Sequence, residues 1–331
     1  MSKMENPKSY NYPKTICITA VGTATSVGVI RNLRKYSPDT FIIGTDINPY
    51  GYTAGSMLVD KFYKISLASD SEYINSIVDV LQSNSVDYLF PINDTEIREV
   101  AAHRKVVEKV VHILLPSVDT VDLVQDKQQM CNTALGIGLK VPDTLNSNYS
   151  GKAIIRDSHG VGSKGIRICD SFDISEINPQ HQFAQRYIEG DEYTVDILSD
   201  EEGTPLFIIP RLRIEVKSGV ATKTKLINDQ SLIDCCMALI KNIPIPGFSN
   251  VQFIKDSVGD NYFIEINPRI GGFSNASLLA APDMFPAFLA MIGTDSADGR
   301  NSSDPYDYSL NHDVRWGAVV TRYYTDLIYE E

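Results

Sequence analysis

Hydrophobic positions in the first third of the chain change repeatedly between two periods. Short β-rich runs occur at TICITAV, TFIIGTD, FYKI, VDYLFP and VHILLP. Between them lie segments with helical spacing, such as SVGVIRNLRKY, in which Val27, Ile30 and Leu33 share one face. Strands that alternate with helices predict a parallel, doubly wound sheet, so we expect a Rossmann-like α/β domain at residues 14–117.

The pattern changes after Lys152, where strands dominate. Extended runs are predicted at KAIIR, GIRIC, QFAQRYI, YTVDIL, PLFIIPRLRIEV, NVQFIK and NYFIEIN. Helical segments interrupt these runs near residues 230–241 and 275–292. We therefore expect an α+β portion in two lobes behind the first domain, and a poorly ordered polar tail at residues 1–13.

Composition narrows the classes of function. The chain has 331 residues, enough for two or three domains, and its formal net charge of −12 argues against nucleic acid as a partner. Five cysteines form no CxxC pair, which favours a reducing compartment and a cytoplasmic protein. The N-terminus has no apolar signal-peptide core, and prolines and an aspartate interrupt the apolar stretch Leu278–Ile292, so no membrane partner is expected.

The run NVQFIKDSVGDNYFIEINPR reads as a β-hairpin with a short glycine-containing loop at Ser257–Asp260. In that register Gln252 lies across from Glu265, and Asn267 follows two positions later on the same face. One carboxylate and two amide carbonyls suit Mg²⁺, which takes much of its shell from substrate phosphates, and Arg269 can reach the same phosphates. A solvated polar face on an edge hairpin is the alternative interpretation.

Two upstream segments offer groups for a nucleotide. In IIRDSHGVGSKGI, a loop with several glycines joins two strands and can present backbone N–H groups, with Lys164 and the strand-end Arg156 adding positive charge. In FAQRYIEGDEYTVDIL, the strand end can offer backbone groups to an adenine edge, while Glu192 can accept from ribose hydroxyls. Taken separately, the first segment also fits a plain hairpin and the second an acidic turn.

A dinucleotide fingerprint is the competing interpretation of the N-terminal domain. The segment TAVGTATSVG follows a predicted strand and opens a helix, and Asp46 ends the next strand. Its glycines, Gly22 and Gly28, are spaced as G-x5-G, which lacks the middle glycine that brings a pyrophosphate close to the backbone. The sequence therefore favours a Rossmann-like sheet without NAD, with an NAD(P)-dependent oxidoreductase as an alternative function.

The order of these motifs resembles the ATP-grasp superfamily over Lys14–Met291, and in particular a single synthetase module of the carbamoyl phosphate synthase large subunit. The motifs are a Rossmann-like domain, DK before a helix, a basic residue with GVGSKG, QRYIEGDEYTVDIL, NVQF and FIEINPR. The resemblance implies a pre-ATP-grasp domain at 14–117, a small lobe at 118–188 and a large lobe at 189–331.

The resemblance also implies roles for individual residues. ATP would bind at Lys127, Arg156, the mobile loop Gly162, Ser163, Lys164 and Gly165, the adenine linker Gln185, Tyr187 and Ile188, and the ribose-binding Glu192. The metal ligands would be Gln252, Glu265 and Asn267, and Arg269 and Lys223 would face the transferring phosphoryl group. Gly272 replaces a second arginine of the synthetase modules, and Gly271 and Gly272 would leave room for a substrate. Arg211, Arg213 and Lys217 are candidates to bind the substrate carboxylate, with surface charges on a strand as the alternative interpretation.

The function implied by the resemblance is an ATP- and Mg²⁺-dependent ligase, with Mn²⁺ as an alternative metal. ATP would convert a small carboxylate into an acyl phosphate, and an amine would then displace phosphate. One alternative is a carbamoyl phosphate synthase-like subunit that acts on bicarbonate or carbamate with a partner, and another is a non-catalytic ATP-binding subunit. We expect a homodimer as the default assembly of such an enzyme.

Overall fold

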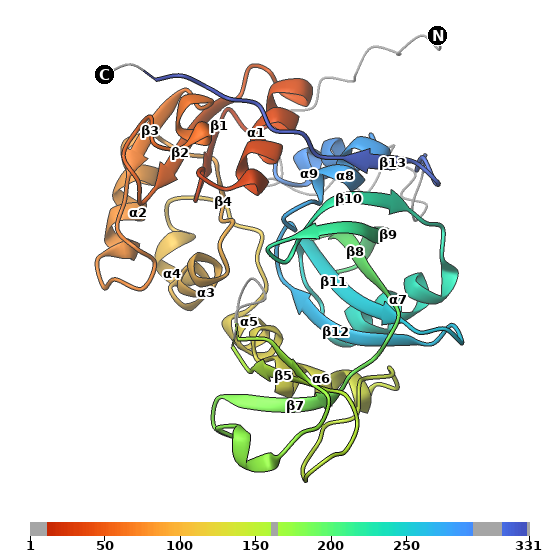
Figure 1. Cartoon of the computed structure of the whole chain (residues 1–331). Coiled ribbons are helices and arrows are strands. Elements are labelled where there is room, and N and C mark those ends of the chain that lie inside the picture. Colours follow the sequence, from red (N-terminus) through yellow and green to blue (C-terminus); the bar gives the residue numbers. More distant parts are fainter. Residues whose placement is uncertain (1–11, 160–164, 294–312, 330–331) are drawn as a thin grey trace. The chain divides into compact units, whose positions relative to one another are not determined.

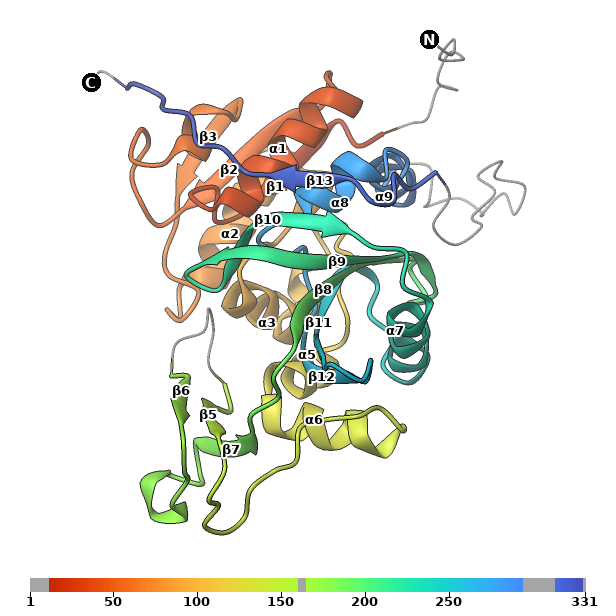
Figure 2. The same cartoon turned by 45° about the vertical axis from the view of Figure 1, so that its right-hand side comes forward.

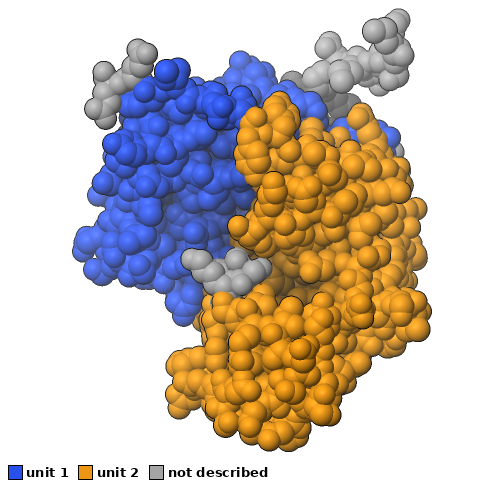
Figure 3. Space-filling model, in the orientation of Figure 1, with its two compact units in different colours: residues 1–115, 281–313, 325–331 blue, residues 116–280, 314–324 orange. Residues whose placement is uncertain are grey.

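A computed structural model describes residues 12–159, 165–293 and 313–329 of the chain. Its residues divide into two compact units (Figure 3). Unit 1 contains residues 1–115, 281–313 and 325–331, and unit 2 contains residues 116–280 and 314–324. Most of the predicted tail and the loop residues Gly162, Ser163 and Lys164 lie outside the described residues, and the predicted domain boundaries stay predictions.

Unit 1 contains a parallel sheet with the order β3-β2-β1-β4 among its described residues. Its strands are β1 (Thr15–Ile18), β2 (Phe41–Asp46), β3 (Lys61–Lys64) and β4 (Tyr88–Phe90). The intervening and following segments form α1 (Ala24–Tyr36), η1 (Ala54–Met57), α2 (Tyr73–Ser83), α3 (Asp94–Ala102) and α4 (Arg104–Val107), and α9 (Met284–Met291) joins the same unit (Figure 1). The predicted Rossmann-like α/β architecture is confirmed.

Two helices of unit 1, α1 and α3, begin at side chains that cap their free backbone N–H groups. Thr23 accepts from the backbone N–H of Ser26 at the start of α1. At α3, Asn93 and Glu96 form a capping box. The Asn93 side chain accepts from the backbone N–H of Glu96, and the Glu96 side chain accepts from the backbone N–H of Asn93. The apolar face predicted for α1 is buried, because Ile30 and Leu33 are each only 1% exposed.

The predicted strand VHILLP is wrong as a full strand. His112 makes a single parallel bridge to Tyr88, and the segment 111–116 belongs to no named strand. Ile113, Leu114 and Leu115 are nevertheless buried, so their apolar character reflects burial in the core of unit 1 and not a continued hydrogen-bonded ladder.

Unit 2 contains two sheets (Figures 1 and 2). The larger, with the order β12-β11-β8-β9-β10-β13, consists of β8 (Asp191–Ser199), β9 (Pro205–Lys217), β10 (Val220–Leu226), β11 (Gly247–Lys255), β12 (Asn261–Asn267) and β13 (Val319–Thr321). The smaller, with the order β6-β5-β7, consists of β5 (Ala153–Asp157), β6 (Arg167–Cys169) and β7 (Gln182–Arg186). The remaining elements are α5 (Val118–Gln125), α6 (Lys127–Gly136), η2 (Ile174–Glu176), α7 (Gln230–Asn242) and α8 (Asn275–Ala280).

Helices α6 and α7 cover one face of the larger sheet. Leu232 and Cys236 of α7 and Met130 of α6 belong to one buried cluster with Val195 and Phe253 from the strands. Close packing of this kind fixes the helices against the strands. As a result, the start of α6 is held beside the β11–β12 hairpin.

The C-terminal segment returns to unit 2 after α9. Its strand β13 pairs antiparallel with β10, and Thr321 is the register partner of Lys223. The sequence pattern did not predict this strand, which is short and half exposed. Across the described ranges, no helix has both the length and the apolar character needed to cross a membrane.

Candidate active site

The β11–β12 hairpin has the register predicted from the sequence at its polar end. Gln252 is the partner of Glu265, and Asn250 is the partner of Asn267. The register shifts between Gln252 and Phe253, because Phe253 pairs with Phe263 and leaves Ile264 as an extra residue on β12. The carbonyl oxygen of Ile264 accepts from Arg156 Nη1 at 3.2 Å, so the irregularity supplies a backbone acceptor to the site.

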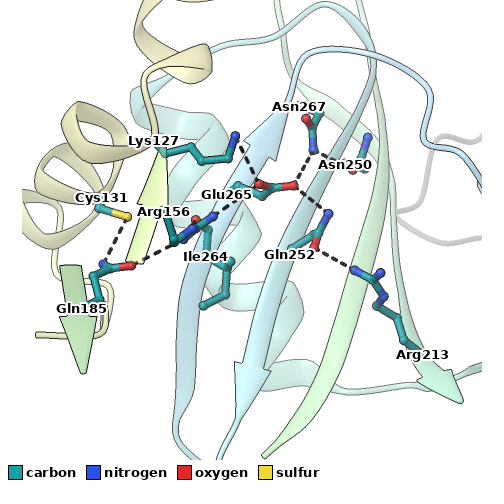
Figure 4. Close-up of polar contacts among 10 residues, drawn as sticks. All are labelled: Lys127, Cys131, Arg156, Gln185, Arg213, Asn250, Gln252, Ile264, Glu265 and Asn267. Atoms are coloured by element: carbon teal, nitrogen blue, oxygen red, sulfur yellow. Dashed lines mark hydrogen bonds and ion pairs between the residues drawn. The ribbon is translucent and has the colours of Figure 1, made fainter. Parts of the chain in front are cut away.

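Glu265 is the centre of the polar contacts drawn in Figure 4. Its Oε1 accepts from Gln252 Nε2 at 2.8 Å and from Asn267 Nδ2 at 3.4 Å. Its Oε2 lies 3.4 Å from Arg156 Nη2 and 3.7 Å from Lys127 Nζ. One partly exposed carboxylate thus faces two cations and two amides.

Arg156 is held in place by buried groups. Its side chain is 5% exposed, and its Nη1 also lies 3.4 Å from Gln185 Oε1. Gln185 in turn donates through Nε2 to the carbonyl oxygen of Pro142 at 3.2 Å and lies 3.7 Å from Cys131 Sγ. Burial raises the pKa of the Cys131 thiol, so this cysteine is a neutral packing partner and not a thiolate nucleophile.

Lys127 is positioned by the start of α6. Asp126 caps the helix by accepting from the backbone N–H of Gln129, and the backbone N–H of Lys127 donates to the carbonyl oxygen of Ser158 at 2.8 Å. The first residue of this helix is therefore tied to Ser158, directly after the strand that carries Arg156. This local geometry brings two cations, 29 positions apart in the sequence, onto the same carboxylate.

The donor set fits a divalent ion that also binds phosphate. Among the described residues, no group of three or more His, Cys, Asp or Glu side chains can hold a metal by itself. A metal here would use the Glu265 carboxylate and amide oxygens, and phosphate oxygens or water would complete its shell. Gln252 Oε1 accepts from Arg213 Nη1 at 2.8 Å, so coordination through this oxygen competes with Arg213 unless the amide turns over.

Asn250 organises the end of the hairpin. Its Oδ1 accepts from Asn267 Nδ2 at 3.2 Å, and its Nδ2 donates to the carbonyl oxygen of Arg269 at 2.9 Å. The Arg269 guanidinium lies 3.3 Å from the carbonyl oxygen of Ile270. Asn250 therefore links a predicted metal ligand to the backbone that carries the predicted phosphoryl-facing arginine.

The predicted adenine linker and ribose acid lie at the junction of β7 and β8. Tyr187 donates its backbone N–H to the carbonyl oxygen of Lys152 at 2.9 Å, which engages that donor inside the chain. The ring of Tyr187 lies 4.2 Å from Lys152 Nζ, and Ile188 is buried. Glu192 is half exposed, with Oε2 3.5 Å from Arg213 Nε.

Three residues predicted to belong to the site have other neighbours. Lys223 Nζ lies 3.4 Å from Glu215 Oε2 on the exposed part of β10, and no described contact joins it to Glu265. Lys217, another candidate to bind the substrate carboxylate, is also exposed and pairs with Glu215. Arg211 is almost completely buried and pairs with Asp196.

At the paired glycines after Asn267 an added side chain would meet neighbouring atoms, and the room predicted there for a substrate stays a prediction. A Cβ at Gly271 would lie 2.7 Å from Ser274 Oγ, and a Cβ at Gly272 would lie 3.0 Å from Val220 Cγ1. Gly165, the described end of the glycine-rich loop, has φ +75, and a Cβ added there would lie 1.9 Å from Asp157 Oδ2. Glycine at these positions therefore allows close packing of the loops that border the site.

Sequence reasoning missed several residues that support the site. Asp196 is a lone acid between Val195 and Ile197 in a buried strand, and that break in an apolar run is the signal that could have drawn attention to it. Asn250 stands two positions before Gln252, on the same face of β11. Arg322 gave no local signal, because its neighbours in space come from β10 and the loop after β12.

Comparison with known proteins identifies both parts of the chain. An ATP-grasp domain matches residues 124–273, and a PylC-like N-terminal domain matches residues 16–114. The chain is 24% identical over 277 residues to pyruvate carboxylase of Staphylococcus aureus, which covers 72% of this chain and 22% of the carboxylase. This chain thus spans less than a quarter of that relative's length.

Solved structures with low sequence identity share the fold. The biotin carboxylase domain of Hydrogenobacter thermophilus 2-oxoglutarate carboxylase, in complex with MgADP, ADP and bicarbonate, has a TM-score of 0.69 and 16% identity, covering 93% of this chain and 73% of that chain. L-amino acid ligase from Bacillus licheniformis has a TM-score of 0.65 and 13% identity, covering 85% of this chain and 74% of that chain. The ATP-grasp resemblance is confirmed: residues 124–273 are an ATP-grasp domain, preceded by a PylC-like N-terminal domain at residues 16–114.

Proposed function

We propose that the chain is an ATP-dependent ligase that activates a small carboxylate and transfers it to an amine. The observation that carries the proposal is the double ion pair of Glu265 with Arg156 and Lys127. Two cations on one carboxylate leave an excess of positive charge in a partly buried site, and such a site favours an added anion. The chain's overall net charge of −12 makes this local reversal more significant.

Binding of MgATP explains why these particular groups lie together. The phosphates would take the place of Glu265 beside Arg156 and Lys127, and Mg²⁺ would take the place of these two cations beside Glu265. Each side chain therefore keeps a partner of opposite charge. Asn267 and Gln252 have amide oxygens that can complete the metal's protein ligands. The contacts with the buried Gln185 and the part-buried Ile264 carbonyl hold Arg156 in one orientation before the nucleotide arrives, which lowers the cost of ordering the site.

The proposed reaction has two steps. A carboxylate oxygen of the substrate attacks the γ-phosphorus of ATP, the bond to the β-phosphate breaks, and ADP leaves. The amine nitrogen then attacks the acyl carbon, inorganic phosphate leaves with the C–O electron pair, and the amine proton passes to solvent. Arg269 is our candidate for neutralising charge on the transferred phosphoryl group, and Mg²⁺ when bound would supply Lewis-acid stabilisation.

The relatives support a ligase without naming this chain's substrates. L-amino acid ligase and the bicarbonate-bound carboxylase domain have the same fold. The acid to be activated is therefore either an organic carboxylate or bicarbonate, and both belong in the test. A cytoplasmic location and a homodimer remain predictions from the sequence.

The test is a phosphate-release screen with ATP, Mg²⁺ and pairs of small carboxylates or amino acids, with bicarbonate plus ammonia as one arm. We expect at least one pair to give phosphate release above the ATP-only background. Glu265→Gln should lower that rate at least about 100-fold, because it removes the charged metal ligand. Glu201→Gln, an exposed acid in a turn, is the charge-matched control and should keep the wild-type rate.

The ligase proposal fails if no pair stimulates release while MgATP binds saturably. That result would support the non-catalytic nucleotide-binding alternative. It also fails if Glu265→Gln retains the full stimulated rate, since the reaction would then not use this site.

A further inference from the structure

Three arginines of unit 2 form a group that we call the arginine cluster: Arg211 and Arg213 on β9, and Arg322 directly after β13. Arg213 contacts Gln252 Oε1, while Gln252 Nε2 contacts Glu265. The side chains of Arg211 and Arg213 are 2% and 6% exposed, and Arg322 is half buried. Guanidinium groups lose much hydration on burial, so a group of three requires compensation.

Arg211 is incompletely satisfied. Its Nε donates to Asp196 Oδ2 at 2.5 Å and its Nη2 to Oδ1 at 3.2 Å. The same carboxylate accepts from the hydroxyls of Ser274 and Ser277, which fixes its position. Arg211 Nη1, by contrast, is buried without a hydrogen-bond partner among the described residues, and a buried orphan donor is rare and costly.

The guanidinium groups of Arg213 and Arg322 lie close enough to Arg211 to be affected by its positive charge. Burial lowers the pKa of Arg213 and of Arg322, and in both cases the positive charge of Arg211 lowers the pKa further. Arg213 also bonds Gln252 Oε1 and thereby connects the cluster to the Glu265 site.

Arg322 has donors left for a ligand. Its Nη2 donates to the carbonyl oxygen of Gly272 at 2.5 Å, and its Cζ lies 4.6 Å from the centre of the Phe273 ring. A guanidinium has five N–H donors, and the hydrogen bond of Arg322 within the described part of the chain uses Nη2, so Nη1 and Nε can contact a bound molecule. The described carboxylates paired with the cluster are Asp196 at Arg211 and Glu192 at Arg213, which leaves one positive charge in excess.

We propose that the arginine cluster binds a carboxylate group of one of the substrates, and that Arg322 makes this subsite specific for an anion. The inference rests on the proposed ligase function and narrows its substrate class. A planar monoanion matches the single excess charge and the fork geometry of guanidinium donors. The phosphates of ATP have their own cations at Lys127 and Arg156, so the cluster is a second anion site.

The surrounding loops favour a small ligand. Val220 lies against Gly272, and the contact is tight enough that a Cβ at Gly272 would be 3.0 Å from Val220 Cγ1. The carboxylate can come from the acid that is activated or from an amino acid that serves as the amine. Both sources share the same chemistry at the cluster, and matched probes can separate them.

The experiment measures binding without turnover, by thermal shift in the presence of Mg²⁺ and an ATP analogue with a non-hydrolysable β–γ bridge. The probes are acetate against acetamide, for the acid source, and L-alanine against L-alaninamide, for the amino-acid source. We expect at least one carboxylate to stabilise the wild type saturably while its neutral amide does not. Arg322→Gln should raise the carboxylate concentration that gives half-maximal stabilisation at least tenfold. Arg315 is exposed on the same segment, and Arg315→Gln should leave that concentration unchanged.

The outcomes separate specificity from loop support. Arg322→Gln keeps an N–H that can donate to Gly272, and Arg322→Lys keeps the charge but loses the fork, so Lys should lie between wild type and Gln. If Arg322→Gln weakened binding of an acid and of its amide equally, Arg322 would only hold the loop. Unchanged half-maximal concentrations in Arg322→Gln, or equal binding of acid and amide by the wild type, would likewise overturn the proposal. Arg322-dependent carboxylate binding without phosphate release in the screen would sink the ligase proposal but leave this subsite standing.

Discussion

Two acidic residues of this chain, Glu265 and Glu96, differ in the groups that face their carboxylates. Glu265 is only partly buried and faces Arg156 and Lys127, so its negative charge is compensated. Glu96 in unit 1 is almost fully buried, and its described partners are the Thr19 hydroxyl and the backbone N–H of Asn93. Burial raises the pKa of Glu96 from 4.5 to about 7, with the charge of Asp46 acting in the same direction.

Glu96 should make unit 1 less stable as the pH rises. Because its pKa is raised in the folded state, the folded chain holds a proton between pH 4.5 and about 7 that the unfolded chain has lost. Stability therefore falls across that window, by roughly 3 kcal/mol for the full shift. Glu96→Gln should flatten the dependence, since glutamine also serves in a capping box.

The measurement for Glu96 is urea unfolding followed by hydrogen exchange in peptides from β1 and α3, at pH 5 and pH 8. The control is Glu99→Gln, a more exposed acid on the same helix, which should keep the wild-type difference. An unchanged pH dependence in Glu96→Gln would show that another group is responsible.

At the scale of elements, the site depends on how strand irregularities and loop conformations place backbone groups. The shift in the β11–β12 ladder leaves Ile264 able to accept from Arg156. The hairpin that carries Gln252 and Glu265 turns at a loop in which Gly259 has φ +94. Register and loop conformation together determine which polar side chains meet.

Two glycines with open surroundings should respond to alanine in opposite directions. A Cβ at Gly259 or at Gly136 would meet nothing within 4 Å, so sterics do not distinguish them. Gly259 has positive φ, and alanine there should cost about 1 kcal/mol of unfolding free energy. Gly136 ends α6 without positive φ, and alanine there should stabilise by up to about 1 kcal/mol.

Urea unfolding monitored by the fluorescence of Trp316, the single tryptophan, checks this pair, because Trp316 lies in unit 2 with both glycines. The two variants serve as controls for each other. A shift of the same sign in both would mean that backbone conformation does not decide the effect.

At the scale of the whole molecule, unit 2 is assembled from segments that are distant in sequence. Its C-terminal part, residues 314–324, follows a stretch that belongs to unit 1. Through Arg322 this segment contacts the loop after β12, and through β13 it extends the larger sheet. Ligand binding at the site should therefore stabilise unit 2 as one body.

MgATP should raise the stability of unit 2 by mass action. At a free concentration 100 times the dissociation constant the gain is about 2.7 kcal/mol. Urea unfolding monitored by Trp316 with a non-hydrolysable MgATP analogue measures it. Glu265→Gln should lose most of the Mg²⁺-dependent gain while Glu201→Gln keeps it, and equal gains in both variants would place the metal elsewhere.

Much of the fold and part of the site could be predicted because the responsible signals are local. The alternation of strands and helices predicted the parallel sheet, and the spacing of Gln252, Glu265 and Asn267 predicted their convergence on one hairpin. The VHILLP run was misread because burial alone produces the same apolar pattern as a strand. The function was inferred from the order of the motifs along the chain, and the roles of the individual residues stay predictions.

The sequence by itself determined most of the element types, the hairpin register at its polar end and the ATP-grasp family, because periodicity, turn residues and ordered motifs are properties of neighbouring positions. Tertiary structure alone decided that Arg156 and Lys127 share Glu265, that Lys223 pairs with Glu215, and that Arg322 lies near Gly272 and Arg211. These contacts join residues far apart in the chain, and no local pattern specifies a distance across a sheet. Packing of β13 and the hairpins fixes them, and with them the electrostatics of the site.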